Sequence, residues 1–205
     1  MVLKICGITR LEDALQAVES GATHLGFVFW SRSPRAIEPD RAGEIVSALP
    51  AGVTSVGVFV NESVDDVRRA VERSGVAAVQ LHGDEEPSYA GELDMPIYRS
   101  VTLDGAPAAA DAWPAGTVLL LDAADPIRRG GTGETVSWAR AADVARRRPT
   151  VLAGGLTPDN VEEAIRTVRP YGVDASSGVE CRPGVKDAAR VADFVTRARR
   201  AFELL

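Results

Sequence analysis

The sequence predicts an α/β fold, a (β/α)8 TIM barrel in which eight strand-and-helix units follow one another and close on themselves. Short apolar runs alternate with segments of helical periodicity along all 205 residues, and no linker or change of composition interrupts them. Several runs are apolar almost throughout, which is typical of strands buried on both faces in a parallel sheet. We therefore expect a single domain over residues 1–205.

The predicted strands are short, and each leaves room for a helix before the next. The run Val118–Leu121 consists of hydrocarbon side chains alone and is the clearest of them. The eight strands are expected at Val2–Cys6, His24–Phe29, Ser55–Val60, Ala77–Leu81, Ile97–Val101, Val118–Asp122, Thr150–Ala153 and Val173–Ala175. A doubly wound open sheet is the alternative. Eight units in so short a chain, and no Gly-x-Gly-x-x-Gly motif after the first strand, favour the closed barrel.

The helices between the strands have boundaries that local residues predict. The signals are a capping box at Thr9-Arg-Leu-Glu12, a cap and a glycine stop at Ser63 and Gly75, and a helix start at Thr157-Pro158. Further helices are expected at Arg41–Leu49, Ser88–Leu93, Trp138–Arg147 and Lys186–Phe202. The alanine-rich segment Asp104–Trp113 predicts only a degenerate fifth helix.

Composition excludes several classes of partner. The net charge of -6 and a pI of about 5.0 argue against a nucleic-acid-binding surface. No apolar run approaches the roughly 20 residues of a membrane span, and the chain begins a strand at once rather than a signal peptide. Cys6 and Cys181 form neither a secreted disulfide framework nor a zinc motif, although a disulfide between them stays open. We expect a cytoplasmic protein with no membrane or nucleic-acid partner.

The carboxyl ends of the strands are where such barrels carry their active sites. Five of the eight predicted ends offer a reactive side chain or a glycine pair: Cys6-Gly7, His82-Gly83, Asp122, Gly154-Gly155 and Asp174-Ala-Ser-Ser-Gly178. Alternation of side chains along a strand puts Lys4 on the same face as Cys6, and Leu120 on the same face as Asp122. Cys6 and Asp122 are then expected to meet over the barrel mouth.

Two loops indicate a phosphate site. Gly154-Gly155 follows the seventh strand, and Ser176-Ser177-Gly178 follows the eighth. Barrels often bind phosphate there, because glycine lets backbone N–H groups approach the ligand and a serine hydroxyl adds a donor. Either loop alone is better explained as a tight turn, but the adjacent pair favours phosphate.

Cys6 and Asp122 each have a structural and a catalytic interpretation. A carboxyl beside apolar surface tends to stay protonated, which suits a general acid, yet Asp122 could equally cap a turn or pair with a cation. Cys6 could act as a general base if a positive neighbour such as Lys4 kept it ionised. Lys4 could instead pair with Asp174, and most free cysteines are simply small buried hydrophobes. The pattern alone favours the structural role for Cys6.

Three further features lie near the expected barrel mouth. Arg35, in the loop after the second strand, is either a solvated charge or a clamp for a carboxylate, which its guanidinium fork fits well. His82 has no second His or Cys at ligand spacing, so no metal site is predicted. The long loop Ala123–Thr135 contains Gly130-Gly-Thr-Gly133 and could be a glycine-hinged lid.

Taken together, the motifs resemble those of the phosphoribosylanthranilate isomerase family. They are Lys4-Ile-Cys-Gly-Ile-Thr9, Gly26-Phe-Val-Phe29, Ser33-Pro-Arg35, Gln80-Leu-His-Gly83, Leu120-Leu-Asp122, Gly130-Gly-Thr-Gly133, Gly154-Gly-Leu156, Gly172-Val-Asp-Ala-Ser-Ser-Gly-Val-Glu180 and Gly184-Val-Lys-Asp187. Each one is weak by itself, but all occur in order from the first strand to the last helix.

The resemblance implies an aldose–ketose isomerase, an intramolecular oxidoreductase of tryptophan biosynthesis. Such an enzyme converts N-(5-phosphoribosyl)anthranilate to 1-(2-carboxyphenylamino)-1-deoxyribulose 5-phosphate without metal or cofactor, and we expect a monomer or a homodimer. Cys6 would be the general base and Asp122 the general acid. The substrate-binding residues would be Arg35 for the anthranilate carboxylate, His82, Asp174, and the phosphate-loop residues Gly154, Gly155, Ser176 and Ser177.

Other phosphosugar barrels are the nearest alternatives, since they share the phosphate loops. Indole-glycerol-phosphate synthase would need catalytic Lys and Glu at strand ends, and a pentose-phosphate epimerase would need metal-binding His and Asp. Neither set is visible in the sequence. A barrel that only binds phosphorylated ligands is the alternative from another class, and Cys6 together with Asp122 counts against it.

Overall fold

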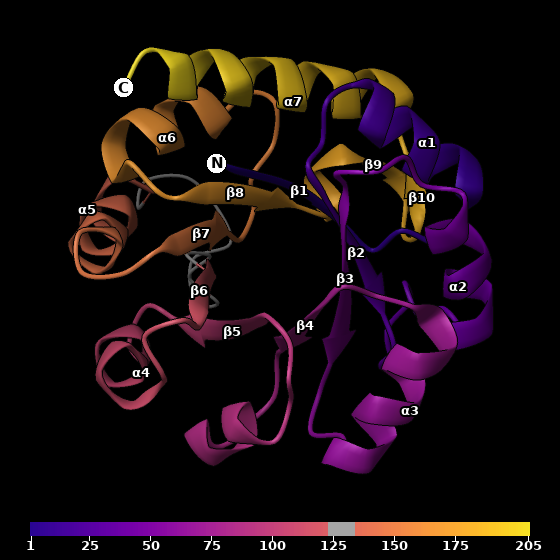
Figure 1. The fold of residues 1–205 in the computed structure, drawn as a ribbon. Coiled ribbons are helices and arrows are strands. Elements are labelled where there is room, and N and C mark those ends of the chain that lie inside the picture. The colour runs from indigo at the N-terminus through magenta and orange to yellow at the C-terminus, as the bar shows by residue number, and fades with distance from the viewer. Residues whose placement is uncertain (123–133) are drawn as a thin grey trace.

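The computed structural model describes residues 1–122 and 134–205, and in this part of the chain eight parallel strands close into a barrel. The strands neighbour one another in chain order, and the last pairs with the first, with Lys4 opposite Asp174. Helices surround the strands, and the carboxyl-terminal helix crosses near the chain's first strand (Figure 1). The (β/α)8 prediction is confirmed. The proposed lid at Ala123–Thr135 falls mainly outside the described residues.

The strands agree closely with the sequence pattern. They are β1 (Val2–Cys6), β2 (His24–Val28), β3 (Thr54–Phe59), β4 (Ala78–Leu81), β5 (Ile97–Thr102), β6 (Val118–Asp122), β7 (Thr150–Ala153) and β8 (Gly172–Ala175). Three have the expected bounds, and the others differ by one residue at one or both ends.

Seven α-helices lie in the described residues. They are α1 (Leu11–Glu19), α2 (Pro39–Ser47), α3 (Val64–Ser74), α4 (Ala106–Ala112), α5 (Glu134–Ala145), α6 (Val161–Val168) and α7 (Ala188–Glu203). The degenerate fifth helix is formed, as the seven-residue α4. The expected short helix at Ser88–Leu93 is instead a 3-10 segment, η1 (Pro87–Gly91). A second 3-10 segment, η2 (Ser177–Val179), follows β8.

The boundaries of α3 follow its local signals, whereas the start of α1 does not. The Ser63 side chain accepts a hydrogen bond from the Asp66 backbone, and Gly75 ends α3 with φ of 66°. The capping box at Thr9 is wrong, because α1 begins at Leu11 after an uncapped Arg10. The hydroxyl of Thr9 donates to the carbonyl of Gly184 instead.

Other helix starts also need correction. The helices expected from Arg41 and Trp138 begin earlier, at Pro39 and Glu134. The helix expected from Thr157-Pro158 begins at Val161, because the Asn160 side chain accepts from the Thr157 backbone at 2.9 Å and holds a turn there. The helix expected from Lys186 begins at Ala188, capped by Asp187. Lys186 belongs to a hairpin of two short strands, β9 (Glu180–Arg182) and β10 (Val185–Lys186), which the sequence pattern did not predict.

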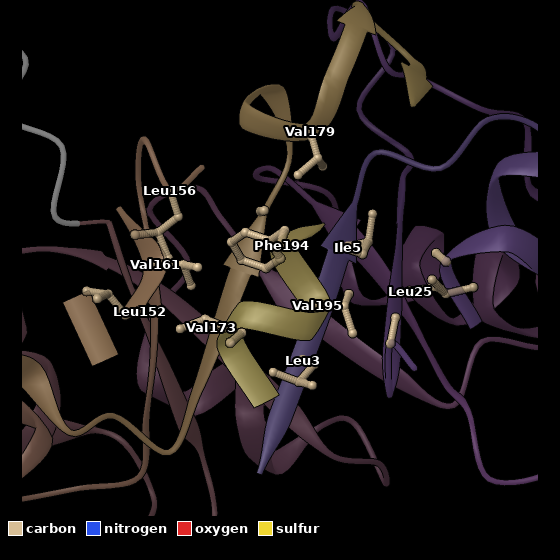
Figure 2. Packing of buried hydrophobic residues seen from close by; sticks show 14 of the residues in the cluster. Leu3, Ile5, Leu25, Leu152, Leu156, Val161, Val173, Val179, Phe194 and Val195 are labelled. Carbon is tan, nitrogen blue, oxygen red and sulfur yellow. The ribbon is translucent and has the colours of Figure 1, made fainter. Parts of the chain in front are cut away.

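The main core lies between the outer faces of the strands and the helices. On β1, Leu3 and Ile5 are fully buried and lie near Phe194 and Val195 of α7 (Figure 2). Alternation then turns Lys4 and Cys6 to the barrel interior. Packing of the outer face therefore fixes which side chains reach the mouth. No helix of the described residues is long and apolar enough to cross a membrane.

Candidate active site

A cavity of about 410 Å³ lies at the carboxyl ends of the barrel strands. It contains every residue that the sequence singled out as catalytic, substrate-binding or phosphate-binding. These nine lining residues are Cys6, Arg35, His82, Asp122, Gly154, Gly155, Asp174, Ser176 and Ser177. Residues spread over 172 positions of sequence thus face one space, because the barrel brings the ends of all its strands to one mouth.

Cys6 and Asp122 reach this cavity from different strands. Cys6 is the last residue of β1 and is 8% exposed, while Asp122 ends β6 and is partly exposed. The sulfur of Cys6 lies over Gly26, where a Cβ atom would come within 2.6 Å of it. The same Cβ would lie 3.1 Å from the ammonium of Lys4. The missing side chain of Gly26 therefore makes room for a thiol and a cation side by side.

Lys4 and Asp174 form a buried ion pair beside the thiol. Nζ of Lys4 lies 2.9 Å from Oδ2 of Asp174, and the lysine side chain is fully buried. Burial works against the charge of Lys4, but Asp174 and Cys6 outweigh it and raise its pKa. Lys4 therefore stays positive. Burial raises the pKa of Asp174 against the opposing effect of Lys4. Among the described residues the other oxygen, Oδ1, is buried without a hydrogen-bond partner.

His82 is held by two polar neighbours. Its Nδ1 lies 3.0 Å from the amide nitrogen of Gln80 and 2.9 Å from the hydroxyl of Ser100. An amide nitrogen can only donate, so in this orientation Nδ1 accepts and the ring proton is on Nε2. Burial, and then the charge of Lys4, lowers the pKa of His82, which makes the neutral form the stable one. The imidazole can offer a ligand an N–H donor.

Arg35 has a partner that the sequence analysis did not name. Its Nε and Nη2 donate to the two carboxylate oxygens of Glu180 at 2.9 and 2.7 Å. Both bonds use one edge of the guanidinium, so the Nη1 edge is the one left for a ligand. Gly7 is required beneath it, because a Cβ there would come within 2.5 Å of the Arg35 side chain.

The two glycine and serine loops lie against each other. Gly154 and Gly155 adopt φ of 86° and 66°, in the left-handed region that favours glycine. The carbonyl oxygen of Leu156 occupies the place where a side chain on Gly178 would be. The loops after β7 and β8 therefore lie in contact through their backbones.

Two buried charged residues, Glu180 and Lys186, lie beneath the cavity, where the sequence pattern does not predict them. The pattern assigns Lys186 to a helix and gives Glu180 no role of its own. In the structure they form an ion pair of 2.8 Å, and Lys186 also donates to the carbonyl of Cys6 at 2.6 Å. The strand that carries Lys186 has only two residues, Val185 and Lys186, which is too short to show periodicity. The sequence pattern therefore does not predict where this lysine lies.

Metal ligation has no support in the described residues, where no group of three or more His, Cys, Asp or Glu side chains could hold an ion. What the cavity does contain is a thiol beside a cation, a carboxyl group, a neutral imidazole and two glycine loops. This set suits proton transfer on an anionic ligand.

Comparisons with known proteins agree on one family. A family model described as N-(5'phosphoribosyl)anthranilate (PRA) isomerase matches residues 3–197. The N-(5'-phosphoribosyl)anthranilate isomerase of Trichlorobacter lovleyi is 49% identical over 203 residues, covering 97% of this chain and 98% of the relative.

Solved structures show the same likeness in three dimensions. Phosphoribosyl anthranilate isomerase from Thermotoga maritima is 40% identical with a TM-score of 0.89, covering 98% of this chain and 100% of that one. A structure of such an isomerase in complex with reduced 1-(o-carboxyphenylamino)-1-deoxyribulose 5-phosphate is 38% identical with a TM-score of 0.86, at 98% and 100% coverage.

Proposed function

The chain belongs to the N-(5'-phosphoribosyl)anthranilate isomerase family, and we propose that Cys6 and Asp122 perform the acid–base chemistry of its reaction. The enzyme acts in tryptophan biosynthesis and catalyses the rearrangement of N-(5-phosphoribosyl)anthranilate to the 1-deoxyribulose 5-phosphate product. This is an aldose–ketose isomerisation, in which hydrogen moves within one molecule and no external oxidant or reductant is consumed.

In the proposed sequence, Asp122 first protonates the furanose ring oxygen. The bond between C1′ and that oxygen breaks, and the anthranilate nitrogen forms a Schiff base with C1′. The thiolate of Cys6 then removes the proton from C2′, and the electron pair moves toward the nitrogen to give an enolamine. Tautomerisation of the enolamine yields the ketose. Each positioned acid or base of this kind contributes typically about 10²–10⁴-fold to the rate.

Electrostatics around Cys6 support its role as the base. A thiol acts as a base only when ionised, and a nearby cation stabilises the thiolate. Lys4 is fully buried, remains charged, and shares the space above Gly26 with the sulfur. Asp174 neutralises part of this charge, and so keeps the lysine from being an isolated buried ion.

The remaining cavity groups suit the rest of the substrate. We assign the phosphate to the backbone and hydroxyl donors of Gly154, Gly155, Ser176 and Ser177. The anthranilate carboxylate fits the Nη1 edge of Arg35, since Glu180 occupies the other edge. The Oδ1 of Asp174, which has no hydrogen-bond partner among the described residues, can accept from a ribose hydroxyl, and Nε2 of His82 can donate a hydrogen bond.

The observation that carries the proposal is that Cys6 and Asp122 line one cavity together with both glycine loops. The test follows the loss of anthranilate fluorescence when purified enzyme meets its substrate. Cys6→Ser and Asp122→Asn should each lower kcat by about 10²–10⁴-fold while circular dichroism shows an intact fold. Wild-type turnover in either folded variant would remove that residue from the mechanism.

The proposal extends to the domain organisation and the oligomeric state. We propose that residues 1–205 act as one catalytic domain, as a monomer or a homodimer, on a small phosphorylated substrate. The relative solved with the reduced ribulose phosphate supports this substrate class. Size-exclusion chromatography with light scattering decides between the two oligomeric states.

A further inference from the structure

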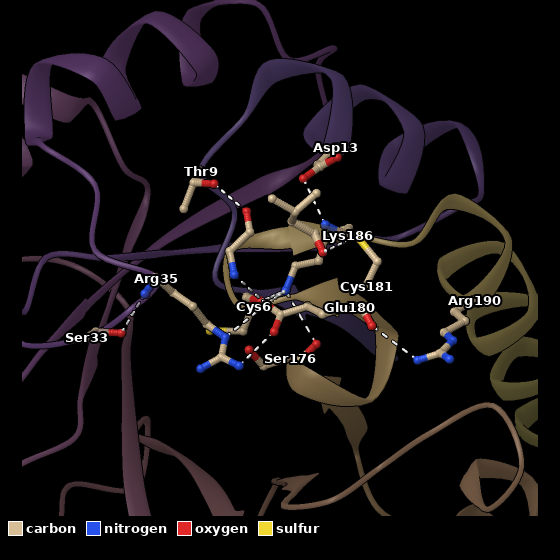
Figure 3. Close-up of polar contacts among 12 residues, drawn as sticks. Cys6, Thr9, Asp13, Ser33, Arg35, Ser176, Glu180, Cys181, Lys186 and Arg190 are labelled. Atoms are coloured by element: carbon tan, nitrogen blue, oxygen red, sulfur yellow. Dashed lines mark hydrogen bonds and ion pairs between the residues drawn. The ribbon is translucent and has the colours of Figure 1, made fainter.

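The ammonium of Lys186 lies at a junction of three parts of the site. It donates to the carbonyl of Cys6 at 2.6 Å, to the carbonyl of Ser176 at 3.4 Å and to Oε1 of Glu180 at 2.8 Å. Figure 3 shows these contacts converging on the one nitrogen. An ammonium has three N–H donors, so the three acceptors satisfy it completely.

Glu180 extends the same network to the substrate side. Oε1 accepts from Lys186 and from the Nε of Arg35, while Oε2 accepts from Nη2 of Arg35 (Figure 3). Burial works against the charge of Glu180, but hydrogen bonds from Arg35 and Lys186 outweigh it and lower its pKa. The carboxylate therefore stays ionised and holds the guanidinium in one orientation.

The hairpin that carries this pair is itself fixed to the barrel. The backbone N–H of Lys186 donates to Asp13 of α1 at 3.0 Å, and the hydroxyl of Thr9 donates to the Gly184 carbonyl. Gly184 has φ of 77°, which glycine adopts without strain. These anchors leave Lys186 little freedom, so its ammonium is held at a set position under the mouth.

Burying two charges is costly, and a buried pair often contributes little net stability compared with apolar residues of similar size. The side chains of Lys186 and Glu180 are 0% and 4% exposed. Neither lines the cavity described above, so neither is placed to touch the substrate. What the pair does is connect three groups that must act on one molecule.

We propose that Lys186 and Glu180 are a positioning pair that holds Cys6, the Ser176 loop and Arg35 in one fixed arrangement. The base, the phosphate loop and the carboxylate clamp come from β1, the loop after β8 and the loop after β2. One ammonium and one carboxylate join all three. The proposal rests on the proposed roles of Cys6, Ser176 and Arg35, and it adds the residues that set the distances between them.

The contribution of Lys186 to the reactivity of Cys6 can be measured without turnover. Three cations interact with Cys6: Lys4 of β1, Arg35 of the loop after β2 and Lys186 of β10. Asp174 of β8 and Glu180 of β9 are the carboxylates paired with them. Lys186→Met keeps an unbranched side chain, shorter by the ammonium group alone, and removes one of the cations. Alkylation of Cys6 by iodoacetamide reports how much thiolate is present, and a Cys181→Ser background removes the other thiol.

In Lys186→Met, alkylation at pH 7 should slow by about 10-fold, the effect of one lost neighbouring charge. Arg190→Met is the matched control, because the exposed Arg190 side chain of α7 donates to the backbone carbonyl of Glu180 rather than to its carboxylate. It should leave alkylation and turnover at wild-type values. Glu180→Gln should raise KM by releasing Arg35, without slowing alkylation.

Two results would overturn the proposal. One is a folded Lys186→Met enzyme whose Cys6 reacts at the wild-type rate. The other is wild-type KM in Glu180→Gln, which decides the matter if Lys186→Met does not fold. Neither result depends on Cys6 being the base. Alkylation needs no catalysis, and KM in Glu180→Gln reports on the Arg35 clamp. Failure of the mechanism would instead appear as normal turnover in Cys6→Ser.

Discussion

Nζ of Lys4 and Oδ2 of Asp174 lie 2.9 Å apart inside the barrel, opposite one another in the pairing of β1 with β8. The pair combines two functions. Lys4 supplies positive charge next to Cys6, and Asp174 presents its second oxygen, buried and unpartnered among the described residues, at the cavity. The ion pair therefore connects the stability of the barrel to the reactivity of the thiol.

Lys4→Met, alone and together with Asp174→Asn, should separate the effect of the ion pair on stability from its effect on the reactivity of Cys6. The single variant leaves Asp174 as an uncompensated buried charge and should lose about 3–5 kcal/mol of unfolding free energy. Lys4→Met with Asp174→Asn should recover much of that stability in urea titrations. Alkylation of Cys6 should be slower than in the wild type in both the single and the double variant, because both lack the ammonium of Lys4. Fast alkylation in the double variant would contradict a role for Lys4 beside the thiol.

His24 should make the fold less stable in mild acid. Burial, and then the charge of Lys4, lowers the pKa of His24 to about 4. A histidine in the unfolded chain takes up a proton below about pH 6.5, whereas folded His24 stays neutral until about pH 4. Over that interval the unfolded state binds more protons, so stability falls as the pH is lowered.

The measurement is the urea midpoint at a series of pH values between 6.5 and 4. His24→Gln should lose less stability across this window than the wild type does. His82→Gln is a useful comparison, because burial also lowers the pKa of His82. The dependence of stability on pH that remains in His24→Gln should include the contribution of His82. An unchanged slope in His24→Gln would show that this histidine is not the group responsible.

Gly26→Ala should displace the proposed base. The new methyl group would lie 2.6 Å from the Cys6 sulfur, closer than any van der Waals contact allows. A displacement of about 1 Å of a reacting group can cost about 100-fold in rate, so kcat should fall by that order. Gly116→Ala, where nothing lies within 4 Å of the added atom, is the control. Equal kcat in the two variants would refute the close fit of sulfur over Gly26.

Gly178→Ala should weaken phosphate binding selectively. The added atom would meet the Leu156 carbonyl and push the loops after β7 and β8 apart. Loss of one hydrogen bond to a charged group corresponds to about 10-fold in affinity, so KM and the inhibition constant of inorganic phosphate should rise together by about that factor. Gly91→Ala, with open space around it, should change neither. Normal phosphate inhibition in Gly178→Ala would place the phosphate elsewhere.

The barrel was predictable because its signals are local. Apolar runs such as Val118–Leu121 mark strands, and Ser63 and Gly75 mark a helix through contacts within a few residues. The nine cavity residues were predictable for a related reason. In a barrel every strand ends at one mouth, so residues at a strand end or in the loop after it are expected to lie together.

The rest of the site depends on contacts that no local pattern contains. Arg35 meets Glu180 across 145 positions of sequence, and Lys186 meets Cys6 across 180. The hairpin that brings them there has strands of three and two residues, too short for any periodicity. Thr9 was misassigned for the same reason, since its partner is Gly184 of that hairpin.

A crystal structure with the reduced ribulose phosphate analogue would show whether Cys6 and Asp122 act on the same sugar. We expect one ligand held between two strands, with the Cys6 sulfur against C2′, the Asp122 carboxyl hydrogen-bonded to the oxygen at C4′, and the phosphate between Gly155 and Ser177. A ligand bound in the cavity with Cys6 away from C2′, or with Asp122 away from that oxygen, would refute the proposed acid–base pair.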